Sequence, residues 1–137
     1  MNTPPCASAQ PLILVLEDEL LIRLVVCETL SQAGYDVVEA EHANEALAHL
    51  RARASEVSAL FTDVHVPGSM DGLALAHLSR RTWPWIALLI ASGRARPTAD
   101  ALPQGGRFLP KPYEPEHVVS HLRELLDCCS GPVRRPG

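Results

Sequence analysis

The sequence predicts an α/β fold, a doubly wound, five-stranded parallel sheet with helices on both faces. Short apolar runs typical of buried strands alternate along the chain with longer segments of helical periodicity. Four of these runs end in polar residues or are directly followed by them, which would place the polar side chains at the carboxyl edge of one sheet, where such folds bind ligands. At 137 residues the chain is long enough for one domain, so we expect a single core.

Five apolar runs are expected to form the strands. They cover residues 12–16, 35–40, 59–63, 87–92 and 107–110. The runs are rich in Leu, Ile, Val and Ala and mostly lack a strict alternation of polar and apolar residues, which is typical of strands covered on both faces.

Four segments with helical periodicity are expected to form the connections, over residues 20–33, 43–54, 71–82 and 114–128. The apolar face of the first is expected to consist of residues that recur near helical spacing, namely Leu21, Leu24, Val25 and Leu30. Gly34 is expected to end this helix, because glycine readily adopts the left-handed conformation that terminates helices.

The residues between the fourth and fifth expected strands do not favour a full helix. Between Pro97 and Pro103 only TADAL remains, about a turn and a half, whereas isolated helices need roughly 12 to 15 residues to be more than marginal. Pro103 blocks extension, and the pair Gly105-Gly106 adds backbone freedom. We therefore expect the helix at this position to be short or disordered, and residues 94–106 to be mobile.

Composition restricts the domain organisation and the classes of partner. Residues 1–10 lack periodicity and are expected to be a disordered leader, followed by a domain over 11–128 and a flexible tail over 129–137. The net charge of −4 gives no electrostatic basis for nucleic-acid binding, and no apolar run is long enough for a signal peptide or a membrane span. We expect a cytoplasmic protein that binds neither nucleic acid nor membrane.

The polar residues that end the strands indicate phosphoryl-transfer chemistry. Glu17 and Asp18 follow the first strand and Asp63 ends the third. Three converging acids are costly without a cation, and Mg²⁺ prefers oxygen ligands. Asp63 is the candidate nucleophile for a phosphoryl group. Lys111, the only lysine among twelve basic residues, would neutralise the developing charge, and Ser92 would donate its hydroxyl.

With these motifs in this order, the chain resembles a response-regulator receiver domain over about residues 11–127. The resemblance implies that Asp63 is the phosphoacceptor and a metal ligand, that Asp18 binds Mg²⁺ directly and that Glu17 binds it through water. It also implies that His65 contributes its backbone carbonyl to the metal. A longer loop than usual, with one additional residue between Pro67 and Gly72, is a departure from the family pattern close to this ligand.

The same resemblance assigns the parts of a switch. Ser92 is the switch hydroxyl, Phe108 occupies the position of the switch aromatic in place of the common Tyr, and Lys111 binds the phosphate and precedes Pro112 across a cis bond. The implied function is a single-domain response regulator, a signalling domain that catalyses its own phosphorylation and dephosphorylation. Its implied partners are a histidine kinase, or a hybrid kinase or phosphotransfer protein, and an unknown downstream protein.

Two alternative functions use similar residues. A haloacid-dehalogenase-like phosphohydrolase needs a second acid two positions after its nucleophile, and this chain has His65 there. A pseudo-receiver, which is a protein-interaction module independent of phosphorylation, usually lacks one of the site residues. Because all of them are present here, the pseudo-receiver is the alternative rather than the main interpretation.

Overall fold

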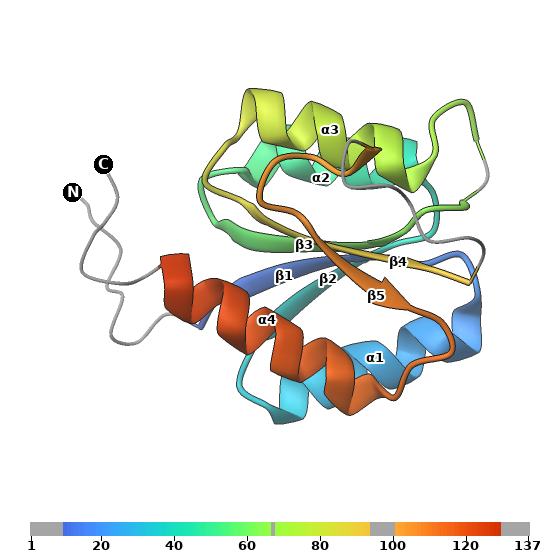
Figure 1. Ribbon diagram of the computed structural model, residues 1–137, viewed down its shortest axis with the longest axis vertical. Helices are drawn as coiled ribbons and strands as arrows, with labels where there is room; N and C mark the ends of the chain where they lie inside the picture. Colours follow the sequence, from blue (N-terminus) through green and yellow to red (C-terminus); the bar gives the residue numbers. More distant parts are fainter. Residues whose placement is uncertain (1–9, 67, 94–100, 130–137) are drawn as a thin grey trace.

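The structure is a computed structural model that describes residues 10–66, 68–93 and 101–129. These residues form one parallel sheet with the strand order β2-β1-β3-β4-β5, which confirms the predicted fold class (Figure 1). The strands are β1 (Leu12–Leu16), β2 (Asp36–Ala40), β3 (Val57–Asp63), β4 (Ala87–Ser92) and β5 (Arg107–Pro110). Only β3 departs noticeably from expectation, because it begins at Val57 rather than at residue 59.

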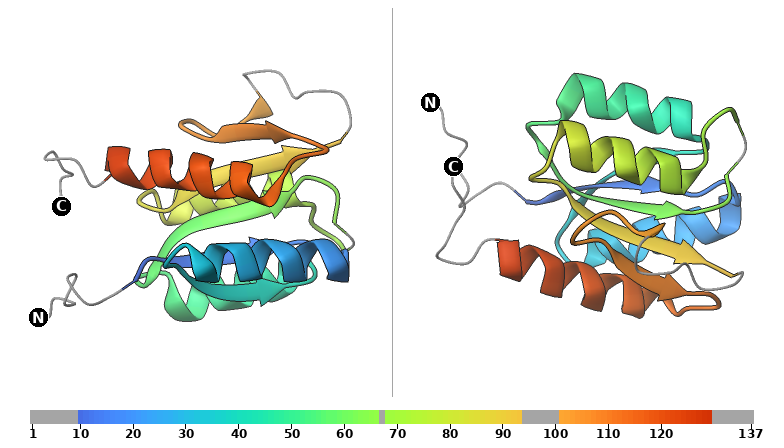
Figure 2. Two further views of the ribbon diagram at one scale, coloured as in Figure 1. Left: turned by 90° about the horizontal axis from the view of Figure 1, so that it is seen from below. Right: turned by 45° about the horizontal axis from the view of Figure 1, so that its top comes forward.

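The described part of the chain contains four α-helices, of which the first three connect strands and the last follows β5. They are α1 (Leu20–Gln32), α2 (Ala43–Arg53), α3 (Gly72–Thr82) and α4 (Pro115–Cys129). Helices α2 and α3 cover one face of the sheet, whereas α1 and α4 cover the other and contact each other (Figures 1 and 2). The helix ends follow local rules: the Asp71 side chain caps α3 by accepting a hydrogen bond from the Ala74 amide, and Gly34, at φ +102°, follows α1.

The sheet separates two apolar cores. Successive side chains of a strand point to opposite faces, so Leu14 and Leu60 pack with α2 and α3, whereas Ile13 and Phe61 pack with α1 and α4. All five residues of β1 are buried, because helices cover both faces of this central strand. The parallel pairing of β1 with β3 places the carboxyl ends of these two strands side by side.

The face of α1 that packs on the sheet is not the predicted one. Leu30 is fully buried, but Leu21, Leu24 and Val25 are 76%, 46% and 51% exposed, and Arg23 is buried instead. The stretch from Leu20 to Cys27 is apolar around almost its whole circumference, so helical periodicity does not decide which side meets the sheet. In the folded protein the side that carries Val26, Cys27 and Leu30 packs on the sheet.

The described residues between β4 and β5, 93 and 101–106, contain no α-helix. This agrees with the expectation of a short or disordered helix at this position, while the rest of that prediction concerns residues 94–100, which lie outside the described residues. The expected leader and nearly all of the expected tail lie outside them as well, so these domain boundaries remain predictions. None of the helices in the described ranges is long and apolar enough to cross a membrane.

Candidate functional site

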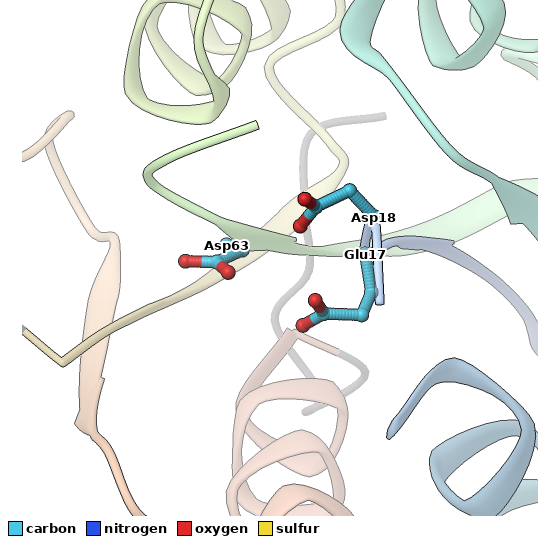
Figure 3. Close-up of side chains that lie close together, drawn as sticks. All are labelled: Glu17, Asp18 and Asp63. Carbon is cyan, nitrogen blue, oxygen red and sulfur yellow. The ribbon is translucent and has the colours of Figure 1, made fainter. Parts of the chain in front are cut away.

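Three carboxylates meet at the carboxyl edge of the two central strands. Glu17 and Asp18 directly follow β1, and Asp63 is the last residue of β3. Leu16 is paired with Thr62 across these parallel strands, so the next residue of each strand brings Glu17 beside Asp63. One oxygen of each carboxylate lies within 4.8 Å of the others, and Figure 3 shows the Glu17 and Asp18 side chains extending from the end of β1 toward Asp63.

The three acids differ in their environments. Glu17 is 2% exposed and Asp63 is 6% exposed, whereas Asp18 is open to solvent. Burial raises the pKa of Glu17 to about 7, although a hydrogen bond from the Glu19 amide and the charge of Lys111 both oppose this shift. The site thus combines a strongly desolvated carboxylate, Glu17, with a solvent-accessible one, Asp18.

Lys111 connects β5 to this acidic cluster. Its Nζ donates a hydrogen bond to Asp63 Oδ2 at 2.7 Å and lies 3.8 Å from Glu17 Oε1. Burial alone would lower the pKa of Lys111, but the hydrogen bond and charge of Asp63, together with the charge of Glu17, raise it overall. The ammonium is therefore positively charged at neutral pH. The backbone amide of Lys111 donates to Ser92 O, and the Lys111–Pro112 bond is cis, as expected.

The other predicted residues lie around the same edge. Ser92 is the last residue of β4 and is 3% exposed. Phe108 pairs with Ile90 in the sheet and is partly buried. His65 is exposed, and its backbone amide donates to Asp63 Oδ1 at 3.4 Å. The structure therefore brings Glu17, Asp18, Asp63 and Lys111 together and places Ser92 and His65 at the ends of the neighbouring segments.

Two supporting residues were missed by the sequence analysis, and the first is Gly72. A Cβ atom at this position would lie 1.8 Å from Asp63 O and 2.4 Å from Thr62 Oγ1, so only glycine allows α3 to begin this close to the end of β3. The Gly72 amide donates to Val64 O at 2.8 Å. The sequence signal for this contact was weak, because a glycine near a helix start usually indicates only a turn.

Arg23 is the second. Its side chain is 7% exposed and lies between the ends of β1 and β2, where it pairs with Glu39 and Glu41 and donates to Glu17 O. The available signal was a single charged residue inside the apolar stretch of α1, five positions after Asp18.

An apolar groove of about 600 Å³ borders the site on the α1 side. It is lined mainly by Leu21, Ile22 and Val25 of α1 and by Lys111, Pro112 and Tyr113 after β5. Because Lys111 also contacts Asp63, the groove and the acidic cluster share one wall.

The family is shown by comparison with known proteins. Residues 13–123 match the model of the response regulator receiver domain. The chain belongs to this family. Receiver domains act in two-component signal transduction and bind Mg²⁺ through an acidic cluster, and the carboxylates of Glu17, Asp18 and Asp63 fit such an ion, because they converge and offer only oxygen ligands.

This receiver domain matches nearly the whole length of some relatives and only a small part of others. It is 34% identical to chemotaxis protein CheY1 of Helicobacter pylori, over 83% of this chain and 95% of that protein. It is 33% identical to the sensor kinase CckA of Brucella abortus, over 88% of this chain but only 13% of that protein. The solved structure of chemotaxis protein CheY4 of Vibrio cholerae superimposes with a TM-score of 0.74 at 26% identity, covering 86% of this chain and all of that chain.

Proposed function

We propose that this receiver domain is a single-domain response regulator that accepts a phosphoryl group on Asp63 in a Mg²⁺-dependent reaction. The observation that carries this proposal is the placement of Asp63, whose carboxylate lies 2.7 Å from the Lys111 ammonium and beside the carboxylates of Glu17 and Asp18. A nucleophilic carboxylate, a cation for the phosphoryl oxygens and an oxygen-rich metal site are the parts that phosphoryl transfer requires.

In the proposed reaction an Asp63 oxygen attacks the phosphorus atom of a phosphohistidine on the donor protein. The new O–P bond forms while the P–N bond breaks, and the electron pair of that bond stays on the imidazole nitrogen. The Lys111 ammonium holds a phosphoryl oxygen, and the Ser92 hydroxyl donates to another. Bound Mg²⁺ supplies positive charge next to the phosphoryl group.

The metal ligands are proposed from the family pattern and from the residues present. Asp18 and Asp63 would bind Mg²⁺ directly, Glu17 would bind it through water, and His65 would contribute its backbone carbonyl. The placement of these residues within one edge of the sheet supports this assignment.

The output is proposed to begin at Ser92. Movement of its hydroxyl toward phosphorylated Asp63 vacates space at the end of β4, and Phe108 on the adjacent β5 turns inward. The described residues that precede β5, 101–106, then reorder and present a changed surface to a downstream protein. Because Phe108 is partly buried beside β4, it is close enough to respond to a shift of that strand.

The proposed phosphodonor is a histidine kinase, or a hybrid kinase or phosphotransfer protein, acting in the cytoplasm. A donor must bring its phosphohistidine to the Lys111–Asp63 pair, and the apolar groove beside this pair offers a contact surface. Leu21 and Val25 line the groove and are exposed, so a protein surface that covers them gains apolar burial near the transfer site.

Phosphorylation assays test the proposal directly. The wild-type chain should be labelled by phosphoramidate and by a phosphorylated donor protein when Mg²⁺ is present but not in EDTA. Asp63→Asn should abolish labelling, whereas the control Asp36→Asn, at the opposite edge of the sheet, should not change it. Folded wild-type protein that stays unlabelled with Mg²⁺ would favour the pseudo-receiver function instead, and undiminished labelling of Asp63→Asn would refute the assigned phosphoacceptor.

A further inference from the structure

The β1–α1 connection, which carries Glu17 and Asp18, is closed by a ring of hydrogen bonds. The Glu19 amide donates to the Glu17 carboxylate at 3.1 Å, and the Arg23 amide donates to Glu19 O at 2.9 Å. Arg23 Nη1 then donates back to Glu17 O at 2.8 Å. Asp18 lies between the joined residues, so the ring restricts the directions in which both acidic side chains leave the backbone.

Arg23 also anchors this ring to the neighbouring strand. Its Nε lies 3.0 Å from Glu39 Oε1 in β2, and its Nη2 lies 3.5 Å from Glu41 Oε2 just beyond that strand. The Glu17 amide donates to Ala40 O at 3.1 Å. The guanidinium thus fixes the carboxyl ends of β1 and β2 to each other from inside the protein, where its side chain is only 7% exposed.

The charge of Arg23 does not explain its position beside a cation site. A buried cation near a bound Mg²⁺ would repel the metal, but Glu39 and Glu41 already neutralise the guanidinium. What remains specific to arginine is geometry, because its rigid planar fork can donate in three directions at once, whereas a lysine ammonium is a point charge on a flexible stem.

We propose that Arg23 is a positioning residue for the metal site, which orients the Glu17 and Asp18 carboxylates by holding the Glu17 carbonyl against the end of β2. This inference rests on the proposed Mg²⁺ site but adds a residue that does not touch the metal. Partners of this kind, one layer outside the ligands, typically change metal affinity by 10- to 100-fold when removed.

The test measures Mn²⁺ binding to the unphosphorylated full chain by the electron paramagnetic resonance of free Mn²⁺, and Mg²⁺ binding by competition. Arg23→Met and Arg23→Lys should each weaken Mg²⁺ binding by roughly tenfold or more, because both lose the fork. Phosphorylation by phosphoramidate at saturating Mg²⁺ should stay within about threefold of wild type, since the ligands themselves remain. Arg53→Met, which removes an exposed pair with Glu56, should leave Mg²⁺ affinity unchanged.

Thermal unfolding measured in parallel ensures that only folded protein is titrated. Wild-type affinity in folded Arg23→Met would overturn the inference, and wild-type affinity in Arg23→Lys would show that charge rather than geometry is needed. If neither variant folds, Glu39→Ala removes the anchor in β2 and should weaken Mg²⁺ binding more than the surface control Glu28→Ala; equal affinities would overturn the inference. Failure of the wild-type chain to bind Mg²⁺ would refute the proposed metal site itself.

Discussion

Two of the acidic side chains at the site, Glu17 and Asp63, are buried close to each other, which disfavours their charged forms. Glu17 is almost fully buried. The ammonium of Lys111 lies 3.8 Å from Glu17 Oε1, but it is also hydrogen-bonded to Asp63. The acidic edge is therefore costly without a metal ion, and binding of the proposed Mg²⁺ would offset this cost.

Glu17→Gln should stabilise the metal-free protein. Burial raises the pKa of Glu17 from 4.5 to about 7, so at pH 8 the folded state carries an ionised group that the unfolded state accommodates more easily. A neutral amide can still accept the hydrogen bond from the Glu19 amide. We expect a gain of roughly 1 to 3 kcal/mol at pH 8 in EDTA, measured by urea denaturation. Glu28→Gln, on the exposed side of α1, is the control, and a loss of stability in Glu17→Gln would contradict the prediction.

Gly72→Ala should disturb both folding and phosphorylation. The added methyl group would overlap the backbone oxygen of Asp63 at 1.8 Å, so the start of α3 or the end of β3 must move. We expect a loss of about 1 to 3 kcal/mol in the free energy of unfolding and slower labelling by phosphoramidate. In Gly93→Ala the new atom would lie 3.4 Å from Lys111 Cβ, an ordinary contact. Equal stability of the two variants would show that the close approach of α3 is not required.

The two sides of helix α1 have different environments, one buried and one exposed to solvent. One side packs Val26, Cys27 and Leu30 on the sheet and buries Arg23, which donates to Glu17 O in the β1–α1 connection. The other side exposes Leu20, Leu21, Leu24 and Val25 next to the groove. An apolar stripe of this kind on a small protein commonly marks a surface that binds another protein.

The double variant Leu21→Ser, Val25→Ser distinguishes binding of the donor protein from the phosphorylation reaction itself. Both side chains are more than half exposed, so the cost to stability should be about 1 kcal/mol or less, mostly from lower helix propensity. Labelling by phosphoramidate should be unchanged, whereas transfer from the phosphorylated donor protein should slow by roughly tenfold or more, corresponding to about 1.4 kcal/mol. Ala48→Ser, at an exposed position of α2, is the control for a serine on a helix surface. Unchanged transfer from the donor would show that it does not use this face of α1.

The site and the exposed face of α1 both depend on the two apolar cores, which hold the strands and helices together. Both faces of the sheet are closed by helices, and the α1 core includes the buried thiol of Cys27, which is 7% exposed. A titration inside this core is therefore felt as a change in global stability.

Stability should fall at alkaline pH partly because of Cys27. Burial raises the pKa of Cys27 from 9.0 to about 12, so above pH 9 the unfolded thiol loses its proton while the folded thiol retains it. Ionisation then favours the unfolded state, and this contribution to stability is lost progressively between about pH 9 and 12. Urea denaturation at pH 8 and 10 should show a smaller loss in Cys27→Ala than in wild type. An equal loss in both proteins would mean that the thiol titrates normally in the fold.

The polar residues that end strands were sufficient to predict the site, because parallel strands deliver their carboxyl ends to one edge. Glu17, Asp18, Asp63 and Lys111 accordingly lie together in the structure. The roles assigned to these four residues, and to Ser92, Phe108 and His65, are not decided by this placement and remain predictions. Residues 94–100, where most of the expected mobile segment falls, are outside the described part of the chain.

The sequence alone determined the order of strands and helices, the doubly wound class and the acidic edge, because burial on two faces and the period of each element are local properties of the chain. Only the tertiary structure decided which side of α1 meets the sheet, since Leu21 and Val25 have the same periodicity as residues that are buried. It also decided that Arg23 lies inside and that Gly72 is needed beside Asp63. Both depend on how closely two elements approach, and the spacing of residues along the chain does not contain that distance.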